Sequence, residues 1–150
     1  MGSIFQNHAL WAGLTAMLIA QLLKPLYHYW TFKEWDLVQI FSSGGMPSSH
    51  SALVCSTATV VGMRSGFDSE IFAVAAVFAI IVLYDAANVR WQSGLHAQRI
   101  NQILREVFNG QPISEEMLKE VIGHTPRQVY AGALLGIIVG LVMEEIWMLH

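Results

Sequence analysis

The run from Ser43 to Ser51 holds the residue types best suited to binding a phosphate group. Its two glycines let the backbone turn tightly, and its proline suits the first turn of a helix. Ser48 and Ser49 would then present amide N–H groups and hydroxyls at a helix start, where anions bind. His50 would stand beside such an anion, and imidazole can donate a proton near neutral pH. The alternative is an ordinary serine N-cap before a membrane helix.

Three basic residues and one carboxylate lie close to the ends of apolar segments. Lys24, Arg90 and Arg127 have the usual alternative role of reaching toward lipid headgroups. Together with the Gly-Ser run they could instead clamp a phosphate, because Arg presents a bidentate donor. Asp85 follows a strongly apolar run, where a carboxylate is costly without a partner. We expect it to pair with a basic residue or to orient a histidine.

His124 lies at the mouth of the last apolar segment and is a candidate nucleophile, because histidine can form covalent intermediates. Its alternative role is that of an interfacial side chain. His8, His28 and His150 have no motif context and receive no role. The histidines lack the spacing of metal ligands, so no metal or other cofactor is expected.

The composition indicates a membrane protein. Of the 150 residues 54% are hydrophobic and 13% are charged, about half the charged fraction of a soluble domain. The length predicts a single domain over residues 1–150. A net charge of -3 argues against nucleic acid as a partner. The one cysteine, Cys55, cannot form an intramolecular disulfide, and the N-terminal segment does not resemble a cleaved signal peptide.

Four apolar segments predict an all-α bundle with about four transmembrane helices. The second is short and contains several hydroxyl residues, so we expect it to be buried among the others. The segments are residues 9–27, 49–63, 71–87 and 129–149.

Basic residues are concentrated in two of the three connections. Seven of the eight flank or lie within them: Lys24, Lys33, Arg90, Arg99, Arg105, Lys119 and Arg127. Only Arg64 lies in the remaining connection. The positive-inside rule therefore predicts a cytoplasmic polar end, both termini outside, and location in the cytoplasmic (inner) membrane.

The connection from 89 to 126 is too long to lack secondary structure. Apolar residues recur at helical spacing over 97–108, and Ser114 has the features of an N-cap for a second helix ending near Gly123. Two short amphipathic helices on the membrane surface are expected. An active-site lid is the alternative.

Three runs carry a family resemblance: Gly-Gly-Met-Pro-Ser-Ser-His-Ser-Ala at 44–52, Tyr-Asp-Ala-Ala-Asn-Val-Arg at 84–90, and Gly-His-Thr-Pro-Arg-Gln-Val at 123–129. Together they resemble a small divergent membrane branch of the type 2 phosphatidic acid phosphatase and vanadium haloperoxidase superfamily. This resemblance covers nearly the whole chain and implies an acid phosphatase-like membrane domain.

The resemblance assigns roles to individual residues. Pro47–His50 matches the superfamily's Pro-Ser-Gly-His motif, with Ser49 in the place of glycine. His50 would protonate the leaving oxygen. The phosphate would be held by Lys24, Ser48, Ser49, Arg90 and Arg127.

Two histidines compete for the role of nucleophile in the superfamily's third motif. His124 has the better context and is preferred, whereas His96 keeps the spacing to Arg90 and is the alternative. The superfamily has aspartate four residues after the nucleophile, where this chain has Gln128. Asp85 could supply that carboxylate from the third apolar segment.

The resulting prediction is hydrolysis of a lipid or isoprenoid phosphate, or pyrophosphate, through a phosphohistidine. The expected partners are membrane lipids and the phosphorylated substrate. The alternative is a non-catalytic membrane protein that keeps the fold and binds a phosphorylated lipid or a partner subunit.

Overall fold

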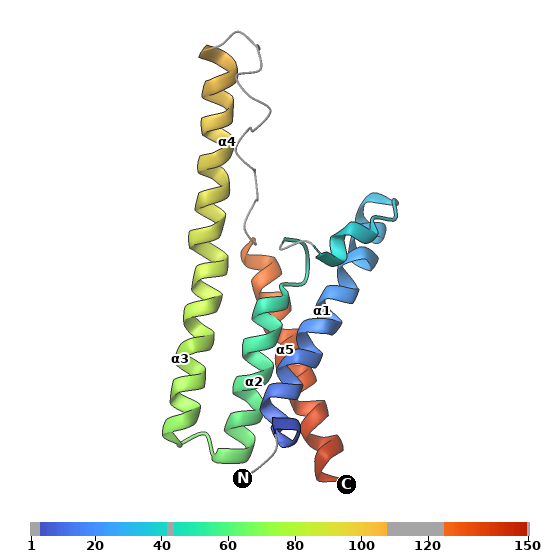
Figure 1. The fold of residues 1–150 in the computed structure, drawn as a ribbon, viewed down its shortest axis with the longest axis vertical. Helices are drawn as coiled ribbons and strands as arrows, with labels where there is room; N and C mark the ends of the chain where they lie inside the picture. Colours follow the sequence, from blue (N-terminus) through green and yellow to red (C-terminus); the bar gives the residue numbers. More distant parts are fainter. Residues whose placement is uncertain (1–3, 42–43, 108–124, 150) are drawn as a thin grey trace.

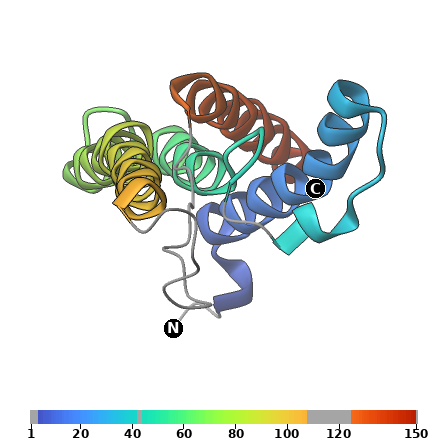
Figure 2. The same cartoon turned by 90° about the horizontal axis from the view of Figure 1, so that it is seen from above.

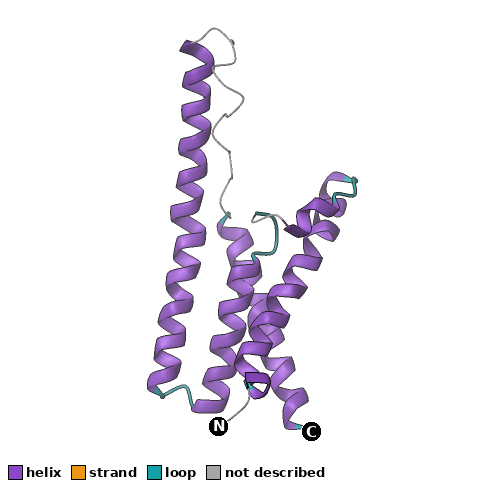
Figure 3. Ribbon diagram, in the orientation of Figure 1, coloured by secondary structure: helices purple, strands orange, loops and turns teal. Residues whose placement is uncertain are grey.

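The computed structural model describes residues 4–41, 44–107 and 125–149 of the chain, and all the regular structure in these ranges is helical (Figure 3). The all-α prediction is therefore confirmed for the described residues. The main helices are α1 (His8–Phe32), α2 (Ser49–Ser65), α3 (Glu70–Tyr84), α4 (Arg90–Val107) and α5 (Pro126–Met148). Short 3-10 helices precede α1 and follow it, at Ile4–Gln6 and Leu37–Phe41.

Helix α2 is the centre of the bundle. It packs against α1, α3 and α5, and α1 also contacts α5. Seen from above, α2 lies between α3 on one side and the α1–α5 pair on the other (Figure 2). Nine of its 17 residues are buried, as expected for the second apolar segment.

Three of the described helical segments are long and apolar enough to cross a membrane: α1, the segment Glu70–Ile103, and α5. Helix α2 is shorter than these three. It is also less apolar, because its inward faces carry serine, alanine and glycine. Those small residues allow helices to approach closely in a membrane. Length and hydropathy thus support three crossings, and the predicted fourth rests on the position of α2 inside the bundle.

The third apolar segment does not end near residue 87 as expected. A π-helical turn, Asp85–Val89, joins α3 directly to α4. Side chains support this continuation, since Asn88 Nδ2 donates to the Tyr84 carbonyl at 3.2 Å and Ser93 Oγ to the Val89 carbonyl at 3.0 Å. No proline interrupts residues 85–97, and a π-turn accommodates an extra residue without breaking a helix.

The two predicted surface helices have different outcomes. Residues 97–107 are helical, but they belong to α4, which extends α3 beyond the start of α5 (Figure 1). The second, expected to end near Gly123, lies outside the described residues. The amphipathic pair therefore stays unconfirmed.

The two ends of the bundle differ in what they contain. At the end we call the polar end, α2 and α5 begin and the π-helical turn leaves α3 (Figure 1). At the opposite, terminal end, α1 begins and both α2 and α5 end. Among the described residues, those singled out by their motifs belong to elements near the polar end or, for His96, to the helix that extends past it.

Candidate functional site at the polar end

Lys24 lies on the buried face of α1, at the polar end. Ala12, Ala16 and Ala20 are each completely buried, and Lys24 follows them at the same interval of four, so it lies on the same inward face. Its side chain is 2% exposed. A lysine in this position is not reaching out to headgroups, which leaves its ammonium inside the polar end.

The loop before α2 folds over Lys24. Gly45 has a positive φ of 88°, and a Cβ at this position would lie 3.6 Å from Lys24 Cδ. Glycine is the residue that adopts this backbone conformation without strain. The segment leading into the loop is also tied to α1 by Gln21, whose Nε2 donates to the Ile40 carbonyl at 2.8 Å. The predicted phosphate loop and Lys24 are therefore neighbours.

Ser48 acts as the N-cap of α2. Its Oγ accepts hydrogen bonds from Ser51 Oγ at 2.9 Å and from the Ser51 amide at 3.4 Å. Its own amide donates to the Gln128 carbonyl at 3.0 Å. Ser48 is completely buried, so its hydroxyl and amide are both used in holding the fold. Ser48 therefore has the N-cap role that the sequence offered as one alternative, and its contact with a phosphate stays a prediction.

Ser49 and His50 occupy the first turn of α2. Ser49 is 5% exposed, whereas the His50 side chain is exposed. The amide groups of a first helical turn have no partner within the helix and can receive an anion. Of the predicted Pro-Ser-Ser-His motif, Ser49 and His50 therefore lie in the first turn of α2, one buried and the other exposed.

The start of α5 is rigidly built. Thr125 Oγ1 accepts the Gln128 amide at 3.4 Å, and Gln128 Oε1 accepts the Thr125 amide at 2.9 Å, which completes a capping box. Pro126 occupies the first turn, and Arg127 beside it is exposed. His124, the predicted nucleophile, lies outside the described residues, immediately before the cap.

A ladder of three glycines fixes the register between α5 and α2. Gly132, Gly136 and Gly140 face the carbonyl oxygens of Ser48, Ala52 and Ser56 in turn. A Cβ at Gly132 or Gly136 would collide with those backbones, and one at Gly140 would lie 3.1 Å from the Ser56 oxygen. This contact, together with the Ser48–Gln128 bond, sets the start of α5 directly against the start of α2.

Asp85 lies where the third helix widens into the π-helical turn. It is half-buried, and the turn contacts α5. Such turns are frequent at functional sites. Arg90 begins α4 one residue after the turn, and the structure describes its backbone only.

His96 is separated from this group. It is exposed on α4 and follows Asp85 by 11 residues, about 16 Å further along the same helix. The structure therefore brings together the elements that carry Lys24, Ser49, His50, Asp85 and Arg127 but not His96.

An apolar groove lies next to this group. It has a volume of about 450 Å³. Its walls come from α1, from the loop before α2 and from α5: Leu23, Leu26, Tyr27, Tyr29, Trp30, Met46, Pro47 and Ala131. Pro47 belongs to both the groove and the Pro-Ser-Ser-His run, so an apolar chain in the groove would end at the start of α2.

Sequence reasoning missed Gln21 as part of the site's frame, whereas the tight turn predicted for the two glycines is found at Gly45. The alanine spacing on α1 could have predicted the burial of Lys24, because it continues the same face. Among the described residues, no group of three histidine, cysteine, aspartate or glutamate side chains could hold a metal ion.

Comparisons with known proteins show the family of this chain. The family model described as the Divergent PAP2 family matches residues 5–139. The uncharacterized membrane protein YuiD of Bacillus subtilis (strain 168) is 35% identical over 157 aligned positions, covering 97% of this chain and 99% of that protein. No solved structure matches. The apolar helices and this relative indicate an integral membrane protein, and the chain belongs to the Divergent PAP2 family.

Proposed function

We propose that this protein is a membrane-embedded phosphatase that hydrolyses a lipid or isoprenoid phosphate or pyrophosphate. One observation carries the proposal: buried Lys24 lies beside the loop that leads into α2, and the starts of α2 and α5 meet next to an apolar groove. A cation and helix N-termini suit a phosphate, and the groove suits the chain attached to it. Membership in a family related to type 2 phosphatidic acid phosphatases supports the same function.

The proposed reaction has two steps. An imidazole nitrogen of His124 attacks phosphorus, and the bond from phosphorus to the lipid oxygen breaks. His50 gives its proton to the departing alkoxide, since it is exposed at the start of α2. Water then attacks the phosphohistidine, which frees inorganic phosphate and restores His124.

The remaining residues are proposed to stabilise charge on the transferring phosphoryl group. Lys24, Ser49, Arg90 and Arg127 would face its oxygens, and preorganised donors of this kind commonly supply much of an enzyme's rate enhancement. Asp85 would orient His124 or a cation. It would replace the superfamily's aspartate, because this chain has Gln128 at that position and the Gln128 side chain is already engaged in the capping box. Neither step uses a metal ion.

A non-catalytic protein that binds a phosphorylated lipid or a partner subunit is the second candidate. It is favoured by the engagement of Ser48, whose hydroxyl and amide serve the fold. A phosphate at this site would lose the Ser48 amide as a donor, because that amide already donates to the Gln128 carbonyl. Binding without turnover needs fewer donors than stabilisation of a transition state does.

Phosphate release from a panel of lipid and isoprenoid phosphates, measured on purified protein in detergent, tests the two candidates. We expect His124→Ala and His50→Ala each to lower the rate at least about a hundredfold. His96→Ala, the matched control, should keep the wild-type rate. No release by a folded protein that still binds the phosphorylated lipid would favour the non-catalytic candidate.

The groove can be tested separately. Ala131→Phe would fill it, whereas Leu134→Phe introduces the same side chain at a position on α5 that is 61% exposed and outside the groove. We expect Ala131→Phe to raise KM for long-chain substrates and to leave short-chain substrates unaffected. Equal effects on both chain lengths would remove the groove from the proposal.

We also propose that the polar end faces the cytoplasm in the inner membrane. The charge distribution supports this orientation, and α1 begins and α5 ends at the same end of the bundle (Figure 1). A reporter that is active only outside the cytoplasm should be active when it is fused after His150. An inactive fusion would place the C-terminus in the cytoplasm and reverse the orientation.

A further inference from the structure

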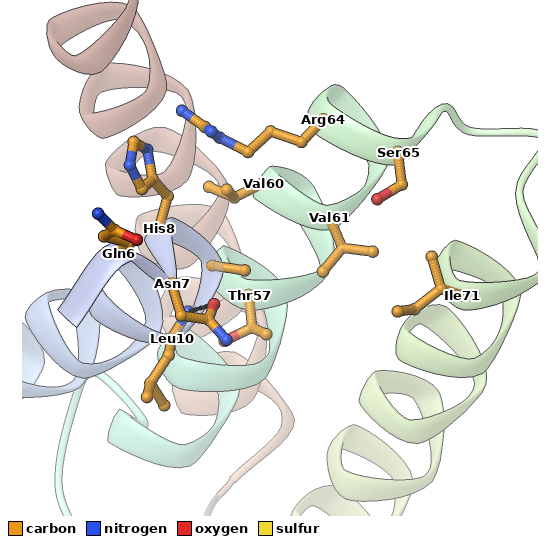
Figure 4. A pocket seen from close by; sticks show the side chains of 11 residues that line it. Gln6, Asn7, His8, Leu10, Thr57, Val60, Val61, Arg64, Ser65 and Ile71 are labelled. Atoms are coloured by element: carbon orange, nitrogen blue, oxygen red, sulfur yellow. Dashed lines mark hydrogen bonds between the residues drawn. The ribbon is translucent and has the colours of Figure 1, made fainter. Parts of the chain in front are cut away.

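The terminal end of the bundle contains a second polar cluster, which the proposed reaction does not use. A cavity of about 460 Å³ lies between the start of α1, the end of α2 and the start of α3 (Figure 4). Its polar lining includes His8, Arg64 and Ser65, and its apolar lining includes Val60, Val61 and Ile71. A cavity with both kinds of lining fits an amphiphile better than it fits a small ion.

Arg64 is the cation of this cavity, and it is held in place from behind. Its Nε donates to Glu144 Oε2 at 2.8 Å, and the Glu144 side chain is 5% exposed. The Arg64 side chain is 41% exposed. Within the described parts of the chain, its two terminal nitrogens make no hydrogen bond. A guanidinium fixed on one edge presents its other edge to a phosphate with little loss of entropy.

His8 adds a second polar group. Its Nδ1 is buried and has no hydrogen-bond partner among the described residues. Its ring lies against Trp147, with ring centroids 4.3 Å apart. Figure 4 shows the His8 and Arg64 side chains on the same side of the cavity, next to α5. Buried polar atoms nearly always have a partner, so this nitrogen is suited to a ligand's hydrogen bond.

We propose that this cavity binds the phosphate headgroup of an anionic phospholipid from the leaflet at the terminal end. Arg64 supplies charge-assisted hydrogen bonds to the phosphate, and His8 supplies one more. The apolar side chains contact the glycerol and the first acyl carbons, which a free phosphate ion lacks. The position fits a headgroup, because Arg64 is the last residue but one of α2 and Glu144 lies one turn from the end of α5. This binding is independent of the phosphatase proposal.

The test measures thermal unfolding of the detergent-purified protein with added phosphatidylglycerol, phosphatidylcholine or inorganic phosphate. Wild type should be stabilised by phosphatidylglycerol in a saturable manner and much less by the other two. Arg64→Gln leaves Glu144 buried without its partner, so Arg64→Gln/Glu144→Gln is the variant that keeps an amide pair and the fold. Arg99→Gln is the matched control, because Arg99 is an exposed arginine on α4.

We expect the double variant to weaken phosphatidylglycerol binding at least about tenfold, the value of one charged hydrogen bond. Arg99→Gln should bind as wild type does. An unchanged shift in the folded double variant would overturn the proposal. Equal stabilisation of wild type by phosphatidylglycerol and phosphatidylcholine would also overturn the proposal, since the net charge of the lipid would then not matter. Equal stabilisation by inorganic phosphate alone would overturn it as well, since the lipid part would then not be needed.

Discussion

Helices α2 and α3 are neighbours, but the less apolar of the two is the more deeply buried. Helix α2 carries serines, threonines and glycines, yet nine of its 17 residues are buried. Helix α3 is almost entirely apolar, yet only Ala79 of its 15 residues is buried. In water the more apolar helix would be the inner one. Here apolar side chains mark the surface that faces lipid, and small residues mark the surface that faces other helices.

This contrast explains how the candidate site is positioned. Small residues let the backbone of α2 approach α1 and α5 closely, so the start of α2 meets the start of α5 and the loop before α2 lies beside Lys24. Helix α3 touches mainly α2, and it contributes Asp85 through its terminal turn. Four predictions test whether close packing on α2 and lipid exposure on α3 are the properties that matter.

The largest effect is expected where α5 touches the backbone of α2. Gly136→Ala puts a methyl group onto the Ala52 backbone, which cannot yield as a flexible side chain does, so the helices must separate. We expect a loss of about 3 kcal/mol in the free energy of unfolding, at the upper end for overpacking. Thermal unfolding in detergent measures it.

Gly140→Ala is the graded control for this ladder. Its Cβ would lie 3.1 Å from the Ser56 oxygen and from Thr59 Cβ, a contact that small shifts can relieve. We expect a loss of about 1 kcal/mol or less. Equal losses at positions 136 and 140 would mean that helix approach is not limited by these contacts.

The next effect is expected in the interior of α2. Val60 is completely buried and borders the cavity at the terminal end, so Val60→Ala removes two methyl groups from inside the bundle and enlarges that cavity. A loss of roughly 2 kcal/mol is expected, measured by the same unfolding assay. A change below about 0.5 kcal/mol would show that α2 is less tightly packed than its burial indicates.

The sequence predicted the helices better than it predicted their contacts. Apolar runs and basic residues indicated four helical segments, a buried second segment and a common polar end. The roles within that end depended on partners far away in the chain. Ser48 became a cap tied to Gln128, 80 residues later, and no local pattern distinguishes a capping serine from a phosphate-binding one.

The continuation of α3 into α4 shows a second limit. Residues after Asp85 become polar, which normally indicates the end of a membrane segment. Hydrophobicity, however, reports where a helix leaves the bilayer and not where it ends. With no proline near the boundary and side chains bonding the carbonyls of Tyr84 and Val89, the helix extends past the polar end.

A smaller effect separates the capping role of Ser48 from a phosphate-binding role. Ser48→Ala removes the acceptor of the Ser51 amide and hydroxyl, so it should cost about 1 kcal/mol of stability. Ser49→Ala removes no capping bond and should leave stability almost unchanged. The two variants measured side by side also separate stability from binding. If the site binds a phosphate, Ser49→Ala should lower the affinity of the protein for the phosphorylated headgroup.

The smallest effect is expected on the lipid face of α3. Val74 is 70% exposed in the bundle, so Val74→Ala exchanges one lipid-contacting side chain for a smaller one and opens no cavity. The change in unfolding free energy should stay within about 0.5 kcal/mol, although the same substitution at Val60 costs several times more. A large loss at Val74 would require a protein surface against α3, such as a second copy of the chain, and concentration-dependent unfolding would then reveal it. Equal behaviour of Val60 and Val74 would break the contrast between the two helices from which the site's geometry follows.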